Sequence, residues 1–118
     1  MMTVEESILD TIKLMLGLTV DYTVFDQEIL VHINTALFTL RQFGVGPDEG
    51  FDVEGRSETW GDFLGSRKTL LKAAKDFVFL SVKQMFDPSG SGTINNMQTD
   101  KLKELTYRLI LEAEAGDG

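Results

Sequence analysis

The residues that come nearest to a ligand-binding pattern lie between Asp87 and Gln98. Oxygen-bearing side chains there follow the spacing of an EF-hand calcium loop, at Asp87, Ser89, Ser91, Thr93, Asn95 and Gln98, with Gly92 at the turn and Ile94 at the usual apolar position. Only Asp87 is anionic, and Gln98 replaces the bidentate glutamate that supplies much of the calcium affinity of such loops. We therefore interpret the segment as a turn between two helices and expect no metal there.

Other candidates for chemistry are few. His32 is the sole histidine, and it falls at the border between the polar and apolar positions of a helix-like segment, beside Asn34. The sequence contains no cysteine, which excludes disulfides, thiol nucleophiles and thiolate metal sites. It also lacks a phosphate-binding glycine loop, a metal-spaced histidine pair and a Gly-x-Ser-x-Gly motif. We therefore expect no catalytic residues, no cofactor and no enzymatic activity.

Composition restricts the class of partner. The chain has 118 residues, of which 42% are hydrophobic and 25% charged, and its formal net charge is −8. A nucleic-acid-gripping module is normally basic, so this charge indicates either a protein partner or DNA that passes without being held. No apolar run approaches the ~20 residues that span a bilayer, and the first residues do not resemble a secretion signal. We expect synthesis in the cytoplasm and no membrane contact.

The segment from Thr69 to Phe86 has the strongest helical pattern, and we expect the core to form around it. Its apolar residues recur at intervals of three and four, at Leu70, Leu71, Ala74, Phe77, Val78, Val82, Met85 and Phe86. Phe79 and Leu80 lie outside that stripe, so a second surface must cover the helix. Polar side chains, among them Lys72 and Lys75, are assigned to water.

Four further helices are predicted around this one. Thr3 and Glu6 have the form of a capping box for a first helix that ends at Gly17. A second helix starts near Thr23 and Asp26 and ends at Gly44 in a left-handed cap, with Val45 folding back. Its expected inner residues are Phe25, Ile29, Ile33, Leu37, Leu40 and Phe43.

A short third helix, capped by Ser57 or Thr59, carries Trp60, Phe63 and Leu64. The last helix begins at Thr93, and an acidic tail from about Glu112 is expected to fray. The residues expected to face inward on this last helix are Ile94, Met97, Leu102, Leu105, Leu109 and Tyr107.

The segment 45–58 is rich in glycine and acids and predicts an exposed loop or a short hairpin. Phe51 and Val53 alternate with acids, so one side of it is apolar. We favour anchoring of this loop on its own domain over docking on a partner.

Together these patterns predict an all-α fold, a small bundle of about five helices forming one domain over residues 1–118.

The order of several motifs along the chain resembles the head-tail connector, or adaptor, proteins of long-tailed bacteriophages and prophages. The resemblance extends from about Ser7 to Leu109. It rests on Ser7-Ile8-Leu9-Asp10-Thr11-Ile12-Lys13, Phe25-Asp26, His32-Ile33-Asn34, Phe43-Gly44-Val45-Gly46-Pro47 with Phe51, Thr59-Trp60, Asp62-Phe63-Leu64, Phe86-Asp87-Pro88, Glu104-Leu105 and Arg108-Leu109. Many relatives continue Asp-Pro-Pro at the turn, whereas Ser89 follows Pro88 here.

The resemblance implies a non-enzymatic subunit of the virion neck that forms a homo-oligomeric ring between the portal protein and the tail or stopper protein. Such a ring extends the DNA channel, through which duplex DNA passes without specific binding. It also implies that the last helix, about Lys101 to Glu114, contacts the portal, and that the loop after the second helix meets a neighbouring subunit or the tail side.

Residues for these contacts can be named only as candidates. Those for the interface are Phe51, Val53, Phe79, Leu80, Tyr107 and Arg108. Acids that could line the channel are Asp48, Glu49, Asp52 and Glu54. The alternative function is a degenerate EF-hand-like or other small acidic helical adaptor that binds protein partners.

Overall fold

The computed structural model describes residues 5–86 and 92–115. Five α-helices and one short 3-10 helix follow one another: α1 (Ile8–Met15), α2 (Asp26–Gln42), α3 (Trp60–Leu64), η1 (Lys68–Leu70), α4 (Leu71–Phe86) and α5 (Gly92–Ala115). The described residues contain no strand, only an isolated bridge between Ser7 and Thr59. The predicted all-α class is confirmed, and the short hairpin considered for residues 45–58 does not form.

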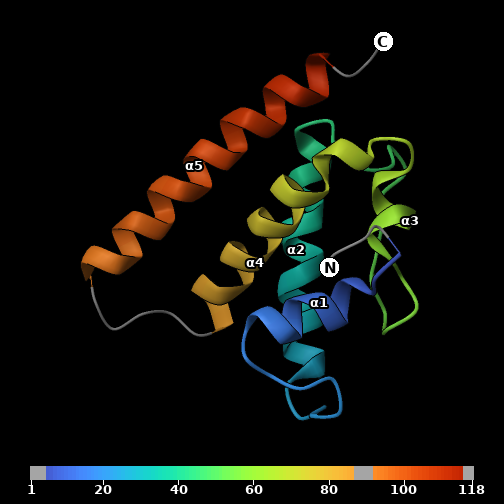
Figure 1. Cartoon of the computed structure of the whole chain (residues 1–118), viewed down its shortest axis with the longest axis vertical. Coiled ribbons are helices and arrows are strands. Elements are labelled where there is room, and N and C mark those ends of the chain that lie inside the picture. The colour runs from blue at the N-terminus through green and yellow to red at the C-terminus, as the bar shows by residue number, and fades with distance from the viewer. Residues whose placement is uncertain (1–4, 87–91, 116–118) are drawn as a thin grey trace.

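Helix α4 lies in the middle of the bundle (Figure 1). It packs against α2 on one side and against α5 on another, while α1 contacts both α2 and α4. Figure 1 shows α5 along one side of the molecule, with α3 and the loop between α2 and α3 on the opposite side. The two sides are therefore built from different parts of the chain.

The core agrees with the predicted pattern of α4 in most positions. Ala74, Phe77, Val78 and Val82 are buried, and they meet buried side chains of the other helices, among them Ile12, Ile33, Leu37, Leu40, Trp60, Phe63, Leu105 and Leu109. Leu70 is buried but belongs to η1, so the α-helix begins at Leu71. Met85 is 44% exposed, against the prediction, and Lys75, assigned to water, is buried.

Two helix ends formed as their residues predicted. Gly44 has a φ of +88°, and Val45 is fully buried and donates its N–H to the carbonyl of Leu40. Thr59 caps α3 through a reciprocal capping box with Asp62. These motifs are local, so the sequence alone carries the information needed to form them.

Three other predictions about helix ends were wrong. α1 begins at Ile8, where Ser7 accepts a hydrogen bond from the N–H of Asp10; Thr3, placed in the predicted capping box, lies outside the described residues. α2 has Phe25 at its N-cap and no side-chain cap, although the N–H of Asp26 donates to the carbonyl of Thr23. α5 runs to Ala115 where a frayed tail was expected, because Ala113 packs into the core and is only 4% exposed.

The inward face of α5 is narrower than predicted. Leu105 and Leu109 are buried and Leu102 packs against the core, but Met97 and Tyr107 are 65% and 66% exposed. The side chain of Ile94 lies outside the described residues. Because α5 packs mainly on α4, only one stripe along it is covered.

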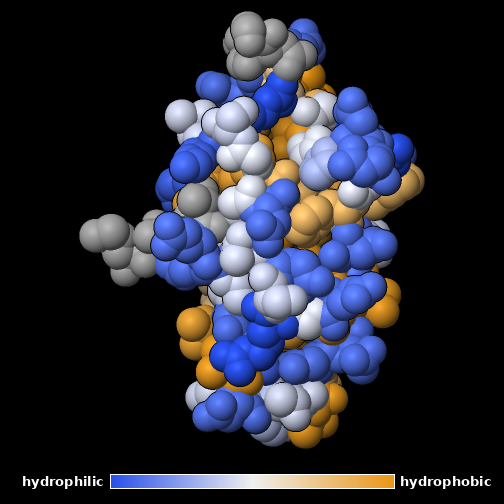
Figure 2. Space-filling model, turned by 90° about the vertical axis from the view of Figure 1, so that its right-hand side faces the viewer, coloured by the Kyte–Doolittle hydropathy of each residue, from blue (hydrophilic) through white to orange (hydrophobic). Residues whose placement is uncertain are grey.

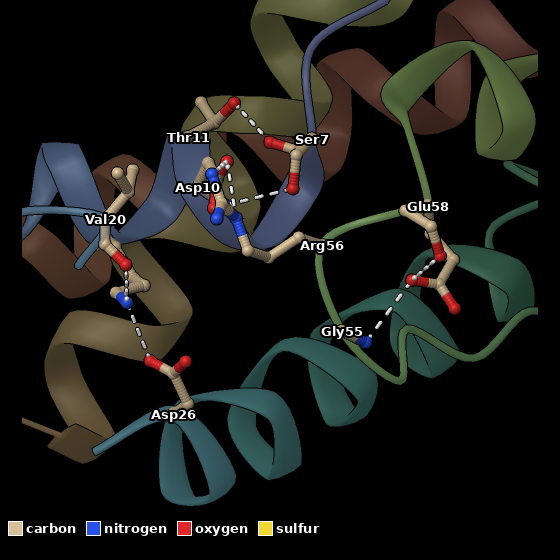
Figure 3. Close-up of polar contacts among 10 residues, drawn as sticks. Ser7, Asp10, Thr11, Val20, Asp26, Gly55, Arg56 and Glu58 are labelled. Carbon is tan, nitrogen blue, oxygen red and sulfur yellow. Dashed lines mark hydrogen bonds and ion pairs between the residues drawn. The ribbon is translucent and has the colours of Figure 1, made fainter. Parts of the chain in front are cut away.

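A buried cation that sequence reasoning overlooked fixes α1 to the start of α2. The Lys13 side chain is 1% exposed, and its Nζ lies 2.8 Å from Oδ1 of Asp26 and donates to the carbonyl of Val20 at 2.9 Å (Figure 3). From the sequence alone, Lys13 is expected to lie on the polar, exposed face of an amphipathic helix. Only the packing of the segment that joins α1 to α2, which contains Val20, removes the Lys13 ammonium from water.

We predict that Asp26→Asn lowers the free energy of unfolding by about 3 kcal/mol, because it leaves the Lys13 ammonium buried beside a neutral group. Urea titration measures the change. The matched control is Asp76→Asn, which breaks the exposed ion pair with Lys72, 3.2 Å long, and is expected to cost less than about 1 kcal/mol. Equal losses in the two variants would contradict a structural role for the buried pair.

Candidate interaction surfaces

The loop between α2 and α3, residues 43–59, is anchored on the core by apolar side chains. Val53 is 1% exposed, and the Phe51 ring lies edge-on to that of Phe63, with centroids 5.5 Å apart. Gly46 has a φ of +98°, and a Cβ at this position would overlap the Phe63 ring, so the close approach requires glycine. Val53 therefore offers no surface to a partner in this conformation, and Phe51 offers part of one.

Hydrogen bonds from α2 hold the loop backbone. The Asn34 amide donates to the carbonyl of Val53 at 3.0 Å and accepts its N–H at 2.7 Å. Nε of Arg41 donates to the carbonyl of Asp48 at 2.9 Å. The sequence showed Asn34 only as a polar neighbour of His32, and its role depends on a contact nineteen residues away.

The end of the loop is closed by two charged contacts (Figure 3). The Glu58 carboxylate accepts the N–H groups of Glu54 at 3.0 Å and Gly55 at 3.3 Å. Arg56 donates from Nε and Nη2 to the Asp10 carboxylate at 3.0 to 3.1 Å, and this contact raises the pKa of Arg56. The loop is thus attached to both α1 and α2.

The four acids considered for a channel wall, Asp48, Glu49, Asp52 and Glu54, are all exposed on this anchored loop. The face of the molecule that carries α3 and the loop is mostly hydrophilic, with scattered apolar side chains (Figure 2). The structure brings these acids together on one side, and their backbone is held in place.

Two grooves lie beside α5. One, of about 420 Å³, lies between α2, α4 and α5 and is lined largely by apolar side chains, including Phe43, Phe77 and Ile110. The other, of about 630 Å³, lies between η1, the first half of α4 and the second half of α5. We call the second one the α4/α5 groove; its wall includes Lys72, Lys101 and Arg108.

The remaining candidate interface residues lie on α4 and α5. Phe79 and Leu80 are partly buried and pack against the core, so α4 has less free apolar surface than its sequence suggests. Tyr107 is exposed beside the first groove, and Arg108 lines the α4/α5 groove, 2.9 Å from Glu104. These two side chains of α5 point to different sides of the helix.

Exposed apolar residues on and just before α2 were not predicted. Val31 and Phe38, on α2, are 63% and 54% exposed, and Val24, which precedes the helix, is 70% exposed. The spacing of seven residues is visible in the sequence and places Val31 and Phe38 on one side of α2. Of the residues predicted for the inner face of this segment, Ile29, Ile33, Leu37 and Leu40 are buried and Phe43 packs against the core, whereas Phe25 is 38% exposed, against the prediction.

Three of the six residues of the ligand pattern before α5 lie within a helix. α4 ends at Phe86 and α5 begins at Gly92, so Thr93, Asn95 and Gln98 belong to α5. Asp87, Ser89 and Ser91 fall outside the described residues. In the described part of the chain no three His, Cys, Asp or Glu residues are grouped to hold a metal, and Nε2 of His32 lies 3.7 Å from the Glu28 carboxylate.

Comparison with known families identifies the class of protein to which the chain belongs. The sequence matches the family described as phage connector protein over residues 8–116. The chain belongs to the phage connector protein family. No curated protein and no solved structure matches it.

Membership confirms the resemblance noted from the sequence and makes the connector a structural component of the phage particle. No helix in residues 5–86 and 92–115 of the connector is long and apolar enough to span a membrane. Membership of the family indicates interaction with other proteins of the phage head or tail.

Charge divides the connector unequally. Residues 5–66 carry twelve acidic and three basic side chains, a net charge of −9, whereas residues 67–118 carry seven acidic and eight basic ones, a net charge of +1. The acidic part contains α1, α2, the loop and α3, and the other contains α4 and α5. The half of the chain that contains the loop is thus strongly acidic, whereas the half that contains α5 is nearly neutral.

We predict that Asn34→Ala destabilises the connector by about 2 kcal/mol, since it removes two hydrogen bonds and leaves backbone groups of the buried Val53 unpaired. Hydrogen exchange at the Val53 amide should be faster in this variant than in the wild type. Thr35→Ala is the control, because its hydroxyl bonds only to the carbonyl of Val31 on the exposed side of the same helix. Slow exchange at Val53 in Asn34→Ala would show that the apolar contacts suffice to hold the loop.

A second prediction concerns pH. Partial burial raises the pKa of Glu58, but the backbone N–H groups of Glu54, Glu58 and Gly55 outweigh it and hold that pKa below the ordinary value of 4.5. The ionised group therefore contributes stability above pH 4.5, and the contribution is lost as the pH falls through the lowered pKa. Glu58→Gln should be less stable than wild type at pH 7 and equally stable at low pH. The free energies of unfolding of the two proteins are measured by urea titration from pH 7 to low pH. A difference between them that stays constant over this range would rule out the contribution of ionised Glu58.

Proposed function

We propose that this connector is a head-tail connector subunit, many copies of which form a ring between the portal and the tail or stopper protein. The observation that carries the proposal is family membership over residues 8–116 combined with two halves of the chain that differ in charge. A closed ring of identical subunits needs two different complementary faces on each copy. A small helical domain with such faces is suited to that task.

The proposed contact with the portal is the outer side of α5. Met97, Tyr107 and Leu111 are 65%, 66% and 48% exposed there, and they are the large apolar side chains that α5 leaves uncovered among its described residues. Exposed aromatic and aliphatic side chains on a rigid helix are typical anchors of protein interfaces. The stripe on α2 provides a further apolar surface, which we assign to the tail or stopper side.

The acidity of the chain gives the ring its proposed relation to DNA. A net charge of −8 on each copy repels a phosphate backbone at short range and offers few basic groups to retain it. Duplex DNA would therefore slide through the channel. We expect no measurable binding of a short duplex at about 100 μM under physiological salt, a weaker interaction than ordinary non-specific binding.

The decisive experiment is capture of this protein by the purified portal protein of the same phage. We predict that Met97→Asp, Tyr107→Asp or both reduce the affinity at least tenfold, about 1.4 kcal/mol, without a comparable loss of stability, since both side chains are exposed. Val31→Asp, an equally exposed change on α2, is the matched control and should bind the portal as wild type does. Particles that retain DNA and acquire tails without this chain would overturn the proposed function.

A further inference from the structure

The α4/α5 groove combines positive charge with an apolar floor. Lys72, Lys101 and Arg108 stand on its wall and outnumber the two acids there, Asp76 and Glu112, while Leu70 and Leu105 form part of the floor. Lys72 and Arg108 keep 85% and 65% of their side chains exposed, although each pairs with an acid one turn away, Asp76 and Glu104. Exposed pairs of this kind contribute little and exchange readily, so these cations remain available to a partner.

The loop between α2 and α3 has the opposite character. Its four exposed acids project from a backbone that Asn34, Arg41 and Glu58 hold by hydrogen bonds. A segment ordered before it binds loses less conformational entropy on binding. The loop therefore has the properties of a preformed acidic ligand.

Helix α5, which forms one wall of the groove, lies on one side of the molecule, and the loop lies on the other (Figure 1). The face around the loop is mostly hydrophilic, which suits a polar contact better than apolar packing (Figure 2). Because the loop and α5 of one copy lie on different sides, we assign a contact between the loop and the α5 wall to two copies. It is heterologous, the type that closes a ring.

We propose that the acidic loop of one copy docks on the α4/α5 groove of the next. This inference rests on the proposed ring and names the faces that form it. Three destinations were open for the loop and its acids, namely the channel wall, a neighbouring subunit and the tail side, and charge complementarity favours the neighbour. The outer side of α5, with Tyr107, stays free for the portal, since Arg108 and Tyr107 belong to different sides of the helix.

Disulfide trapping tests the contact directly, because the natural chain has no cysteine. One protein carries Asp52→Cys on the loop, and the other carries Thr69→Cys, an exposed position on the groove wall that leaves all three cations in place. The two full-length proteins are mixed under oxidising conditions, alone and with purified portal. The proposal expects the mixed dimer to exceed either homodimer in at least one setting, and to decline as salt rises.

Charge reversal supplies the control. Lys101→Glu with Arg108→Glu in the groove protein should lower the mixed dimer about fivefold or more, and Glu49→Lys with Glu54→Lys in the loop protein should restore it. Lys103→Glu, on the other side of α5, should leave the yield unchanged. The proposed contact would be overturned if mixed dimers and homodimers formed in equal yield, or if no mixed dimer formed either with or without portal. It would also be overturned if the charge reversal in the groove left the yield of mixed dimer unchanged. Portal capture by the wild-type chain would still stand in those cases, so the proposed function is tested separately.

Discussion

The structure depends on covering α4 from two directions. Its buried residues, Ala74, Phe77, Val78 and Val82, meet α2 and α5, and the aromatic pair Phe43 and Phe77, with centroids 6.2 Å apart, joins the end of α2 to the middle of α4. Phe79 and Leu80 broaden the apolar surface beyond one stripe, so a single neighbouring helix would leave part of it in water. Two covering helices on different sides of α4 follow from this requirement, and they give the molecule two unlike surfaces.

Helix α5 is the more loosely connected of the two covering helices. It is buried along one stripe only, and its C-terminal end is held by Arg67, whose guanidinium donates to the carbonyls of Ala113 and Gly44 at 3.2 and 2.9 Å. One side chain thus ties the end of α5 to the end of α2. The rest of α5 is free to present both its apolar outer side and its charged wall, which is why it contributes to more than one candidate surface.

Sequence reasoning succeeded where the signal was local. The periodicity of α4, the Gly44 cap with Val45 and the Thr59 and Asp62 capping box each depend on residues a few positions apart, and each formed. The family could also be recognised from the order of motifs. The predictions that failed depended on packing between segments. Periodicity cannot show that Lys13 would be buried under the segment that joins α1 to α2, or that Met97 and Tyr107 would stay exposed.

Candidate surfaces were harder to predict for the same reason. The alternation of Phe51 and Val53 with acids correctly separated an apolar from a polar side, but only the structure shows that Val53 and the Asn34 hydrogen bonds use the apolar side internally. This leaves the acids as the exposed part of the loop. Their partner could not be inferred from composition, because the basic residues that line the α4/α5 groove come from α4 and α5 and are brought together by the fold.

The unequal charge of the two halves of the chain addresses a problem that any ring of this chain must solve. Copies of net charge −8 repel one another, and packing them around a channel that also holds DNA adds to the repulsion. A Debye length of about 8 Å at physiological salt limits this repulsion mostly to surfaces in contact, so the local charge at each interface matters more than the total. In the proposed ring, an acidic loop against the cations of the α4/α5 groove allows approach in one orientation and disfavours acidic loops meeting each other. The charge distribution that would repel DNA can therefore also direct how the copies meet.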